Sequence, residues 1–270
     1  PFDFVRIVFS MIMRAMKSTL GVTLFANATL GWPVNVLPAE IAQRVIDGGR
    51  QVCSDAGIPL AGGHSIDSPE PIFGLAVTGQ VAKAHLKRNN SAEPGCLLYL
   101  TKPLGVGVLT TAQKQKKLQP GHEGLAVATM CQLNRVGATL GPMPGVKAVT
   151  DVTGFGLLGH LLEMCEGSGV QAELDFAAIP ILEPVPGYIA QGCVPGGTAR
   201  NFASYGHKLA ELTDYQKALL CDPQTSGGLL IAVAPEAVDA LEAVLRQAGI
   251  VPHRIGELMQ RSPGPWVQLR

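Results

Sequence analysis

The spacing of hydrophobic residues alternates along the chain between the period of a helix and that of a strand. Residues 38–56 carry apolar side chains at helical spacing, with Pro38 at the start and Gly57 after the end, and predict a helix. Further helices are predicted at residues 106–117, 122–140, 157–165 and 235–248. Apolar and β-branched runs predict strands at residues 72–81, 96–100, 146–149, 170–176, 229–233, 254–258 and 266–269. This pattern suits a compact α/β or α+β protein.

Two parts of the chain have weaker patterns. Residues 4–17 fit one amphipathic helix, residues 21–26 a strand and residues 30–33 a turn. Residues 180–206 are rich in proline and glycine and are predicted to be a long irregular loop. A loop of that length in a compact domain is more often functional than not.

Asp151 follows the predicted strand 146–149 and precedes a predicted helix, with Gly154 and Gly156 in the turn between them. Glycine lets the backbone approach a ligand closely, and a helix start offers free N–H groups and the positive end of a dipole. A carboxylate and a phosphate repel each other, so a site that holds both usually needs a cation between them. Mg²⁺ commonly bridges carboxylates to phosphates. A simple glycine-rich turn with Asp151 as a helix cap explains the same residues.

Two further glycine-rich turns carry polar residues. Residues 60–65 predict a strand that runs into a turn with Gly63, His64 and Ser65. Backbone N–H groups, an imidazole and a hydroxyl together suit phosphate contact, although a lone turn histidine is more often structural. In the second turn, Asp222 precedes a proline and has the ordinary role of a turn residue.

Composition and charge narrow the class of function. Lys+Arg and Asp+Glu number 21 each, so no charge imbalance points to nucleic acid or to an anionic membrane surface. The six cysteines are scattered without a CxxC pair, which favours reduced thiols in the core of a cytoplasmic protein over a zinc site or disulfides. No run of 18 or more uncharged apolar residues predicts a transmembrane helix. Residues 11–28 imitate a signal peptide, which we interpret as a coincidence.

The chain is long enough for two domains. Residues 83–95 are polar, end in a Pro-Gly pair and are the best candidate for a linker. The predicted organisation is an N-terminal domain in residues 1–82, a linker in residues 83–95 and a C-terminal α+β domain in residues 96–270.

Five motifs together resemble those of the selenophosphate synthetases, also called selenide, water dikinases. The resemblance runs from about residue 30 to residue 270, in order and without obvious gaps. The motifs are Leu60–Pro71 (LAGGHSIDSPEP), Leu100–Gly107 (LTKPLGVG), Asp151–His160 (DVTGFGLLGH), Pro195–Tyr205 (PGGTARNFASY) and Cys221–Leu230 (CDPQTSGGLL).

The resemblance implies an α+β, two-domain, aminoimidazole-ribotide-synthetase-like (PurM-like) fold. Residues 1–82 would be the remainder of an ATP-binding domain that forms a homodimer through a shared β-barrel. The implied reaction converts ATP, selenide and water to selenophosphate, AMP and phosphate, and requires Mg²⁺. Carried over by motif, Asp151 would be a magnesium ligand, and Gly63, His64 and Ser65 would contact ATP across the dimer. The chemistry fits, because backbone amides and a hydroxyl take up phosphate charge that grows during transfer.

The sequence departs from this family at its front. The family carries a reactive Cys or selenocysteine, an essential Lys and further acids before the position of Pro1, so no catalytic residue is assigned within the chain. An expected acid also falls at Ala15, within Met11–Gly21 (MIMRAMKSTLG), although the spacing on both sides is preserved. This segment is either diverged or disturbed in its reading frame.

Two classes of function therefore remain. The first is a selenophosphate synthetase. A ribotide synthetase, a thiamine-phosphate kinase or a hydrogenase-maturation protein has the same fold but matches the His64-Ser65 and Asp222–Gly228 motifs less well. The second is a degenerate paralogue that only dimerises or binds nucleotide. The altered segment Met11–Gly21 favours the paralogue, and the intact Asp151, His64 and Ser65 disfavour it.

We expect the complete protein to be an ATP-dependent phosphotransferase and this chain to have feeble activity at most. The reason is that the missing carboxylates leave the charge of Mg²⁺ and the phosphates uncompensated. The measurement is selenide-dependent AMP formation by the isolated chain, and sensitive detection of that product would contradict the expectation.

Overall fold

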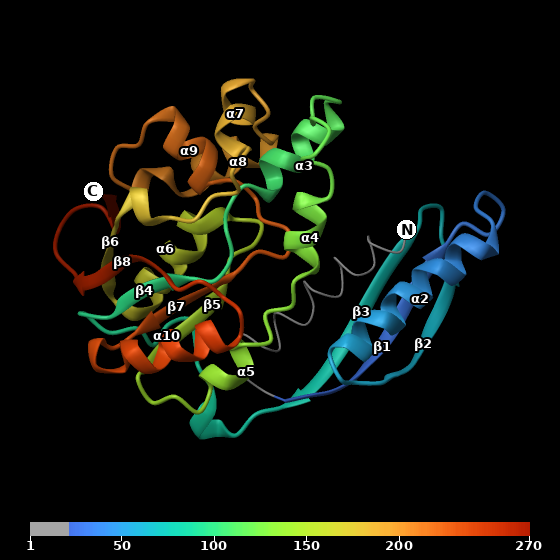
Figure 1. Ribbon diagram of the computed structural model, residues 1–270, viewed down its shortest axis with the longest axis horizontal. Helices are drawn as coiled ribbons and strands as arrows, with labels where there is room; N and C mark the ends of the chain where they lie inside the picture. Colours follow the sequence, from blue (N-terminus) through green and yellow to red (C-terminus); the bar gives the residue numbers. More distant parts are fainter. Residues whose placement is uncertain (1–21) are drawn as a thin grey trace.

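The computed structural model describes residues 22–270, which form a small β-sheet with one helix packed on it and a large β-sheet with helices on both faces (Figure 1). The small sheet has the order β2-β1-β3, with β1 parallel to β2 and antiparallel to β3. Its strands are β1 (Val22–Trp32), β2 (Leu60–Asp67) and β3 (Ile72–Gln80). The predicted strand 72–81 is confirmed, and the predicted helix 4–17 lies outside the described residues.

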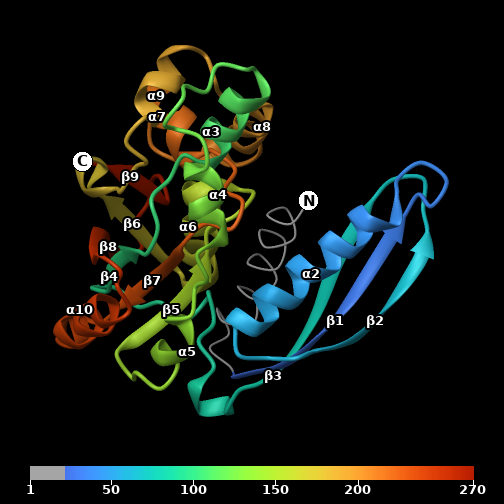
Figure 2. The same cartoon turned by 45° about the vertical axis from the view of Figure 1, so that its right-hand side comes forward.

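Helix α2 (Ala39–Asp55) packs on one face of the small sheet and confirms the helix predicted at residues 38–56 (Figures 1 and 2). Pro38 has the extended backbone of a residue just outside a helix, and Gly57 follows the end with a φ of +74°. The apolar stripe of α2 and alternate residues of β1 form one buried cluster. Its members from these two elements include Val45, Val52, Cys53, Ala26, Ala28, Leu30 and Trp32.

The structure corrects two expectations in the small sheet. Residues 30–33 were predicted to turn, but Leu30 to Trp32 complete β1. Residues 62–65 were predicted to form a glycine turn, but they lie inside β2, which continues to Asp67. Pairing with β1 overrides the local preference of Gly-Gly for a turn, and a Cβ at Gly63 would lie only 2.2 Å from the Ala28 carbonyl oxygen.

The large sheet has the order β5-β7-β4-β8-β6-β9 and confirms the strands predicted after residue 95. Within this sheet, as the structure describes it, β6 and β9 form a parallel pair and the other named strand pairs are antiparallel, as is typical of the α+β class. The strands are β4 (Leu97–Leu100), β5 (Val146–Asp151), β6 (Val170–Leu174), β7 (Leu229–Val233), β8 (His253–Gln260) and β9 (Val267–Leu269).

Helices cover both faces of the large sheet. On one face lie α3 (Val106–Lys114), α4 (Leu125–Cys131), α6 (Gly156–Ser168), α7 (Val185–Ala190), α8 (Gly196–Tyr205) and α9 (Asp214–Leu220). On the other face lie α5 (Gly137–Leu140) and α10 (Val238–Gln247). Short 3₁₀ turns are found at Lys83–His85, Phe176–Ala178, Gly206–Lys208 and Pro235–Ala237. Residues 83–95 join the two sheets.

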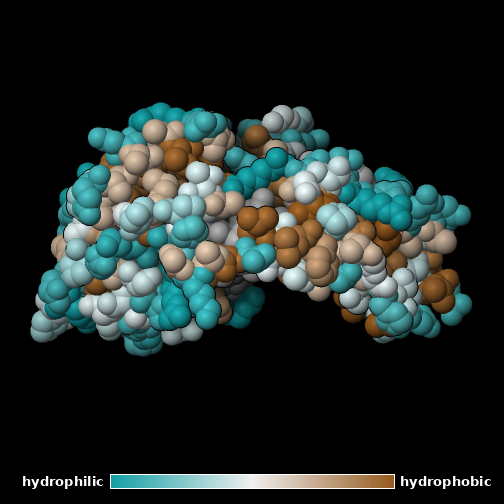
Figure 3. Space-filling model, turned by 90° about the horizontal axis from the view of Figure 1, so that it is seen from below, coloured by the Kyte–Doolittle hydropathy of each residue, from teal (hydrophilic) through white to brown (hydrophobic). Residues whose placement is uncertain are grey.

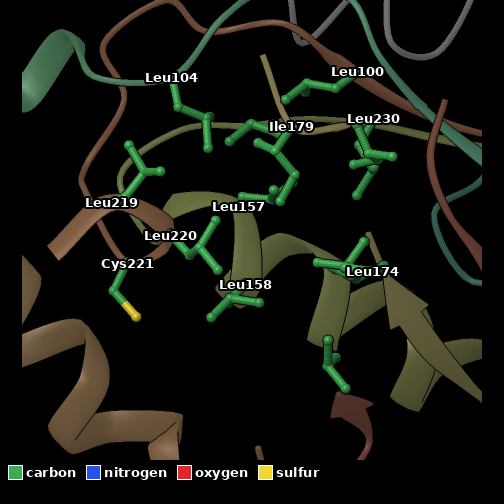
Figure 4. Close-up of a cluster of buried hydrophobic side chains, with 14 of the residues drawn as sticks. Leu100, Leu104, Leu157, Leu158, Leu174, Ile179, Leu219, Leu220, Cys221 and Leu230 are labelled. Atoms are coloured by element: carbon green, nitrogen blue, oxygen red, sulfur yellow. The ribbon is translucent and has the colours of Figure 1, made fainter. Parts of the chain in front are cut away.

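Strand β7 shows why the sequence of the large sheet is so apolar. All five of its residues, LLIAV, are buried. Leu230 and Ala232 belong to the cluster under α6, whereas Leu229, Ile231 and Val233 belong to the cluster under α10. Figure 4 shows part of the first cluster, with leucines of α6, α9 and several strands in one apolar layer. A central strand covered on both sides is therefore apolar at every position.

The predicted single helix at residues 122–140 is wrong, because the structure has two short helices there, α4 and α5. The backbone becomes extended at Gln132. The buried ammonium of Lys102 accounts for this end, because it donates to the carbonyl oxygens of Thr129 and Gln132 at 3.1 and 2.6 Å. It thereby satisfies carbonyl groups that the helix end leaves without partners.

The region 180–206 is not one irregular loop, as the proline and glycine content predicted. It contains α7 and α8, and Pro184 and Pro195 stand at their N-cap positions. Proline suits the start of a helix because the first N–H groups have no intrahelical acceptor. Helix α9 was also missed, although Thr213 and Gln216 form a capping box at its start.

The six cysteines are free, and all except Cys131 are buried, as expected for reduced core residues. Desolvation raises the pKa of Cys53 to about 11, which keeps this thiol protonated and unreactive. Among residues 22–270, no helix is long and apolar enough to cross a membrane.

Candidate functional site

Four of the five sequence motifs meet at one end of the large sheet, although up to about half the chain separates them. They are the motifs at Leu100–Gly107, Asp151–His160, Pro195–Tyr205 and Cys221–Leu230. Val152 donates to the Gly228 carbonyl oxygen at 2.9 Å, and Gln224 donates from its backbone to the Thr153 carbonyl oxygen at 2.9 Å. The Leu229 N–H donates to the Thr101 hydroxyl at 2.8 Å. The ends of β5 and β4 and the start of β7 are thus tied together by their flanking turns.

The turn from Asp151 to Gly156 is held from outside at successive residues. The Thr153 hydroxyl lies 2.7 Å from a ring nitrogen of His160. Asn201 of α8 donates to the Gly154 carbonyl oxygen at 2.8 Å, and Tyr205 donates to the Phe155 carbonyl oxygen at 2.6 Å. These contacts explain the motif in α8, since Asn201 also donates to Cys221 in the neighbouring turn at 3.0 Å.

Gly156 is required by the shape of this turn. Its φ is +73°, in the left-handed region, and a Cβ there would lie 2.7 Å from the Leu220 carbonyl oxygen. Helix α6 starts at Gly156, confirming the predicted order of strand, glycine turn and helix.

Asp151 lies at the surface end of β5 with its side chain half-buried and its backbone paired with Leu229. Thr153 is also half-buried, and Gly154 and Phe155 are exposed. Within the described residues, no hydrogen bond engages the backbone N–H groups of Gly154 and Phe155, which lie at the positive end of the α6 dipole.

The donor set here fits a magnesium ion that is held largely by phosphates. Residues 22–270 contain no group of three or more His, Cys, Asp or Glu side chains that could enclose a metal. Mg²⁺ does not need such a cage, because it keeps waters and binds one or two carboxylates together with nucleotide phosphates. Asp151 offers a carboxylate for this incomplete shell, and the N–H groups of Gly154 and Phe155 offer donors for the phosphates rather than for the metal.

The structure does not bring Gly63, His64 and Ser65 to Asp151 within one chain. They lie on β2, at the edge of the small sheet, whereas Asp151 lies on the large sheet (Figure 1). His64 pairs with the exposed Thr29, and Ser65 pairs with the buried Leu30. Successive strand residues point to opposite faces, so Ser65 points toward α2 and His64 toward the open face.

A hollow of about 190 Å³ is lined by Gly63, His64 and Ser65 together with Ile46 and Arg50 of α2. The three residues singled out in the sequence therefore border one hollow at the edge of the small sheet, although the side chains of His64 and Ser65 point to opposite faces.

The sequence predicted only a turn residue at Asp222. In the structure its side chain is fully buried and binds backbone groups of another segment. Its Oδ2 accepts from the Gly107 N–H at 3.0 Å and from the Gln224 side-chain amide at 2.7 Å. The Gln224 side-chain oxygen accepts from the N–H groups of Gly105 and Val106, both at 3.3 Å. Asp222 and Gln224 thus cap the start of α3, where Gly105 has no side chain to do so.

The second carboxylate oxygen of Asp222, Oδ1, has no hydrogen-bond partner among the described residues. Desolvation raises the pKa of Asp222 to about 7, against the opposing effect of the hydrogen bonds from Gln224 and the α3 backbone. The sequence signal for the capping role of Asp222 is Gly107, the last residue of the LTKPLGVG motif. The carboxylate packs against Gly107 so closely that a Cβ there would lie 2.3 Å from Oδ1.

Asp222 should make the protein less stable as the pH rises. The pKa of Asp222 is about 7 in the folded state and about 3.9 in the unfolded state, so the folded state binds the proton more tightly. The stability that this proton contributes is present below about pH 4 and is lost as the pH rises toward and through 7. One pKa unit corresponds to about 1.4 kcal/mol, so the loss between pH 4 and 8 is on the order of 4 kcal/mol.

Urea unfolding of the wild type and of Asp222→Asn across this range measures the effect. The variant should lack this part of the slope, and parallel slopes in the two proteins would contradict the assignment.

Comparisons with known proteins agree with the arrangement of two sheets. Residues 1–81 match the family described as AIR synthase related protein, N-terminal domain, and residues 93–264 match the corresponding C-terminal domain. The fold is similar to a thiamine-monophosphate kinase from Stenotrophomonas maltophilia, with a TM-score of 0.76 and 19% identity, covering 99% of this chain and 78% of that one. It is also similar to the hydrogenase maturation protein HypE in complex with ATP, with a TM-score of 0.72 and 17% identity over 95% of this chain and 71% of that one.

Proteins of known name are much more similar in sequence. The selenide, water dikinase of Pseudomonas putida is 60% identical over 97% of this chain and 76% of its own length. That of Photobacterium profundum is 61% identical over 96% of this chain and 75% of its own length. This identity extends across both sheets and the turns that meet at Asp151, and the chain belongs to the selenide, water dikinase family of AIR synthase related proteins.

Proposed function

We propose that this protein catalyses ATP-dependent formation of selenophosphate from selenide and water, with release of AMP and phosphate. The observation that carries the proposal is the meeting of four family motifs around the Asp151 turn, in a chain about 60% identical to proteins named selenide, water dikinase. Binding of ATP is further supported by fold neighbours solved with ATP or its analogue AMPPCP.

In this proposal, Asp151 is a magnesium ligand and the exposed start of α6 receives phosphate. Mg²⁺, when bound, would neutralise phosphate charge and hold the phosphates in line for transfer. The backbone N–H groups of Gly154 and Phe155, which precede α6, are proposed to bind the same negative charge, and the hydrogen-bonded turn limits their reorganisation. The hydrogen bonds from Asn201 and Tyr205 serve this rigidity.

Gly63, His64 and Ser65 are proposed to contact ATP that is bound at Asp151 of a partner chain. The support is their placement on the outer strand of the small sheet, remote from Asp151 of their own chain. Because His64 and Ser65 point to opposite faces, one phosphate group can meet only one of these two side chains, together with edge backbone groups of β2.

The open face of the small sheet is the proposed homodimer surface. It bears exposed apolar residues that include Val22, Leu24, Ile66 and Ile72. Figure 3 shows apolar surface toward the side of the molecule where Figure 1 places this sheet. Exposed apolar patches of this kind commonly mark protein interfaces.

Asp151→Ala should weaken ATP binding in the presence of Mg²⁺ by roughly tenfold or more, because the loss of a charged ligand costs at least about 1.4 kcal/mol. Isothermal titration calorimetry of ATP with and without Mg²⁺ measures this. Asp239→Ala, which removes an exposed acid from α10 on the other face of the sheet, is the matched control. Equal affinities for Asp151→Ala and the control would remove Asp151 from the proposed site.

The same titrations bear on the degenerate paralogue. Selenide-dependent AMP formation by this chain, together with Mg²⁺-dependent ATP binding, would exclude that alternative.

Ala76→Glu should shift the oligomeric state toward the monomer. Ala76 is an exposed residue of β3 next to the buried Leu75, so its side chain lies on the open face. A carboxylate there would be buried without a partner in the proposed dimer. Light scattering after size exclusion gives the mass, with Gln43→Glu on the exposed side of α2 as control. A mass unaffected by Ala76→Glu would place the dimer surface elsewhere.

A further inference from the structure

A series of polar side chains runs along α6 and ends at the turn that carries Asp151. Thr153 Oγ1 lies 2.7 Å from Nε2 of His160, whose side chain is almost fully buried. On the other edge of the ring, Nδ1 lies 3.7 Å from Oε2 of Glu163. The other Glu163 oxygen accepts a hydrogen bond from Asn89 at 2.9 Å. The imidazole thus has a hydroxyl within hydrogen-bond distance of Nε2 and a carboxylate near Nδ1.

The Glu163 carboxylate decides which nitrogen of a neutral His160 carries the proton. Neutral imidazole has one N–H and one acceptor nitrogen, and the group facing each nitrogen selects the tautomer. A carboxylate facing Nδ1 favours the proton on Nδ1, although 3.7 Å is too long for a direct hydrogen bond. Nε2 is then an acceptor, and the 2.7 Å contact is a hydrogen bond that the Thr153 hydroxyl donates.

This direction of donation determines what Thr153 presents to a ligand. With its proton committed to His160, the hydroxyl offers only oxygen lone pairs on its remaining side. Lone pairs suit a hard cation or the waters around it, whereas a free hydroxyl proton would suit a phosphate oxygen.

We propose that His160 is a positioning residue that makes Thr153 an acceptor oxygen for the cation of the nucleotide site. The inference rests on the proposed function, because Asp151, two residues before Thr153, is the proposed magnesium ligand. A carboxylate and a threonine hydroxyl two residues apart in one turn form a donor set that Mg²⁺ accepts beside phosphates. Glu163, on the surface of α6, acts through His160 and touches no ligand itself.

The position of the ring proton is measured directly by ¹⁵N NMR of the histidine side chains in the full 270-residue chain. We expect the Nδ1–H tautomer for His160 at neutral pH, with its signals identified by their loss in His160→Gln. Glu163→Gln removes the charge that faces Nδ1 and should shift the ring toward Nε2–H. Glu166→Gln removes the same charge from the same helix, but at a residue that pairs with Lys208, and should leave the tautomer unchanged. An Nε2–H tautomer, or a ring protonated at both nitrogens, in the unmodified chain overturns the proposal, because Nε2 would then donate to Thr153.

Calorimetry with ATP tests the oxygen of Thr153. Thr153→Val keeps the shape and removes the oxygen, whereas Thr153→Ser keeps the oxygen. We expect Thr153→Val to weaken ATP binding in the presence of Mg²⁺ by about tenfold and to leave binding without Mg²⁺ unchanged, and Thr153→Ser to stay close to the wild type. A loss of equal size with and without Mg²⁺ would indicate a contact to ATP itself and would overturn the proposal.

Asp151→Ala in the same titrations separates this inference from the proposed function. If Asp151→Ala weakens Mg²⁺-dependent binding and Thr153→Val does not, the role of Thr153 and His160 is wrong and the proposed site stands. If the unmodified chain shows no Mg²⁺-dependent ATP binding, the cation on which both proposals depend is absent and both fail.

Discussion

A buried carboxyl group and a buried carboxamide, Asp222 and Gln224, hold the arrangement on which the candidate site depends. Their side chains bind three successive backbone N–H groups at the start of α3. The Gln224 backbone binds the turn after Asp151, and Gly228, four residues on, accepts from Val152. One short segment therefore fixes α3, β7 and the end of β5 relative to one another. The position of Asp151 follows from this segment.

Burial of so much polar structure is tolerated because almost every group has a partner. An unpaired buried polar group costs about 1–3 kcal/mol, so a partly satisfied network would destabilise the fold. Lys102 donates to Ser226 at 2.8 Å as well as to the carbonyl groups at the end of α4, and the Ser226 hydroxyl donates to Met130 at 2.6 Å. The network thus connects α4 to the same turn as Asp222. Rigidity around Asp151 is its result, since no single turn can move without breaking bonds to the others.

The sequence predicted those features that depend on local pattern. The stripe of α2, the apolar β7 and the turn between β5 and α6 are visible in short windows, because periodicity and glycine act locally. The Gly-Gly-His-Ser segment was misjudged because pairing with β1 decides its conformation. The role of Asp222 was underestimated because its burial and its hydrogen bond with Gly107 depend on a segment more than a hundred residues away. Its bond with the nearby Gln224 does not by itself reveal that role. The resemblance to a family located the motifs, but only the fold shows that four of them meet and that the fifth does not.

The order of strands in the large sheet has a consequence for how the protein is made. β7 lies between β5 and β4, although it follows both by many residues in the chain. During synthesis, β4 and β5 emerge before β7, the strand with which both of them pair in the folded sheet. The hydrogen bonds between Gln224 and the start of α3 span 118 and 119 residues, so they form after most of the chain has left the ribosome. Topology of this kind slows folding, because a long loop must close before its contacts compensate for the lost entropy. The arrangement of turns around Asp151 is therefore among the last parts of the protein to form, and a nascent chain that stops before residue 229 lacks the strand that pairs with Asp151.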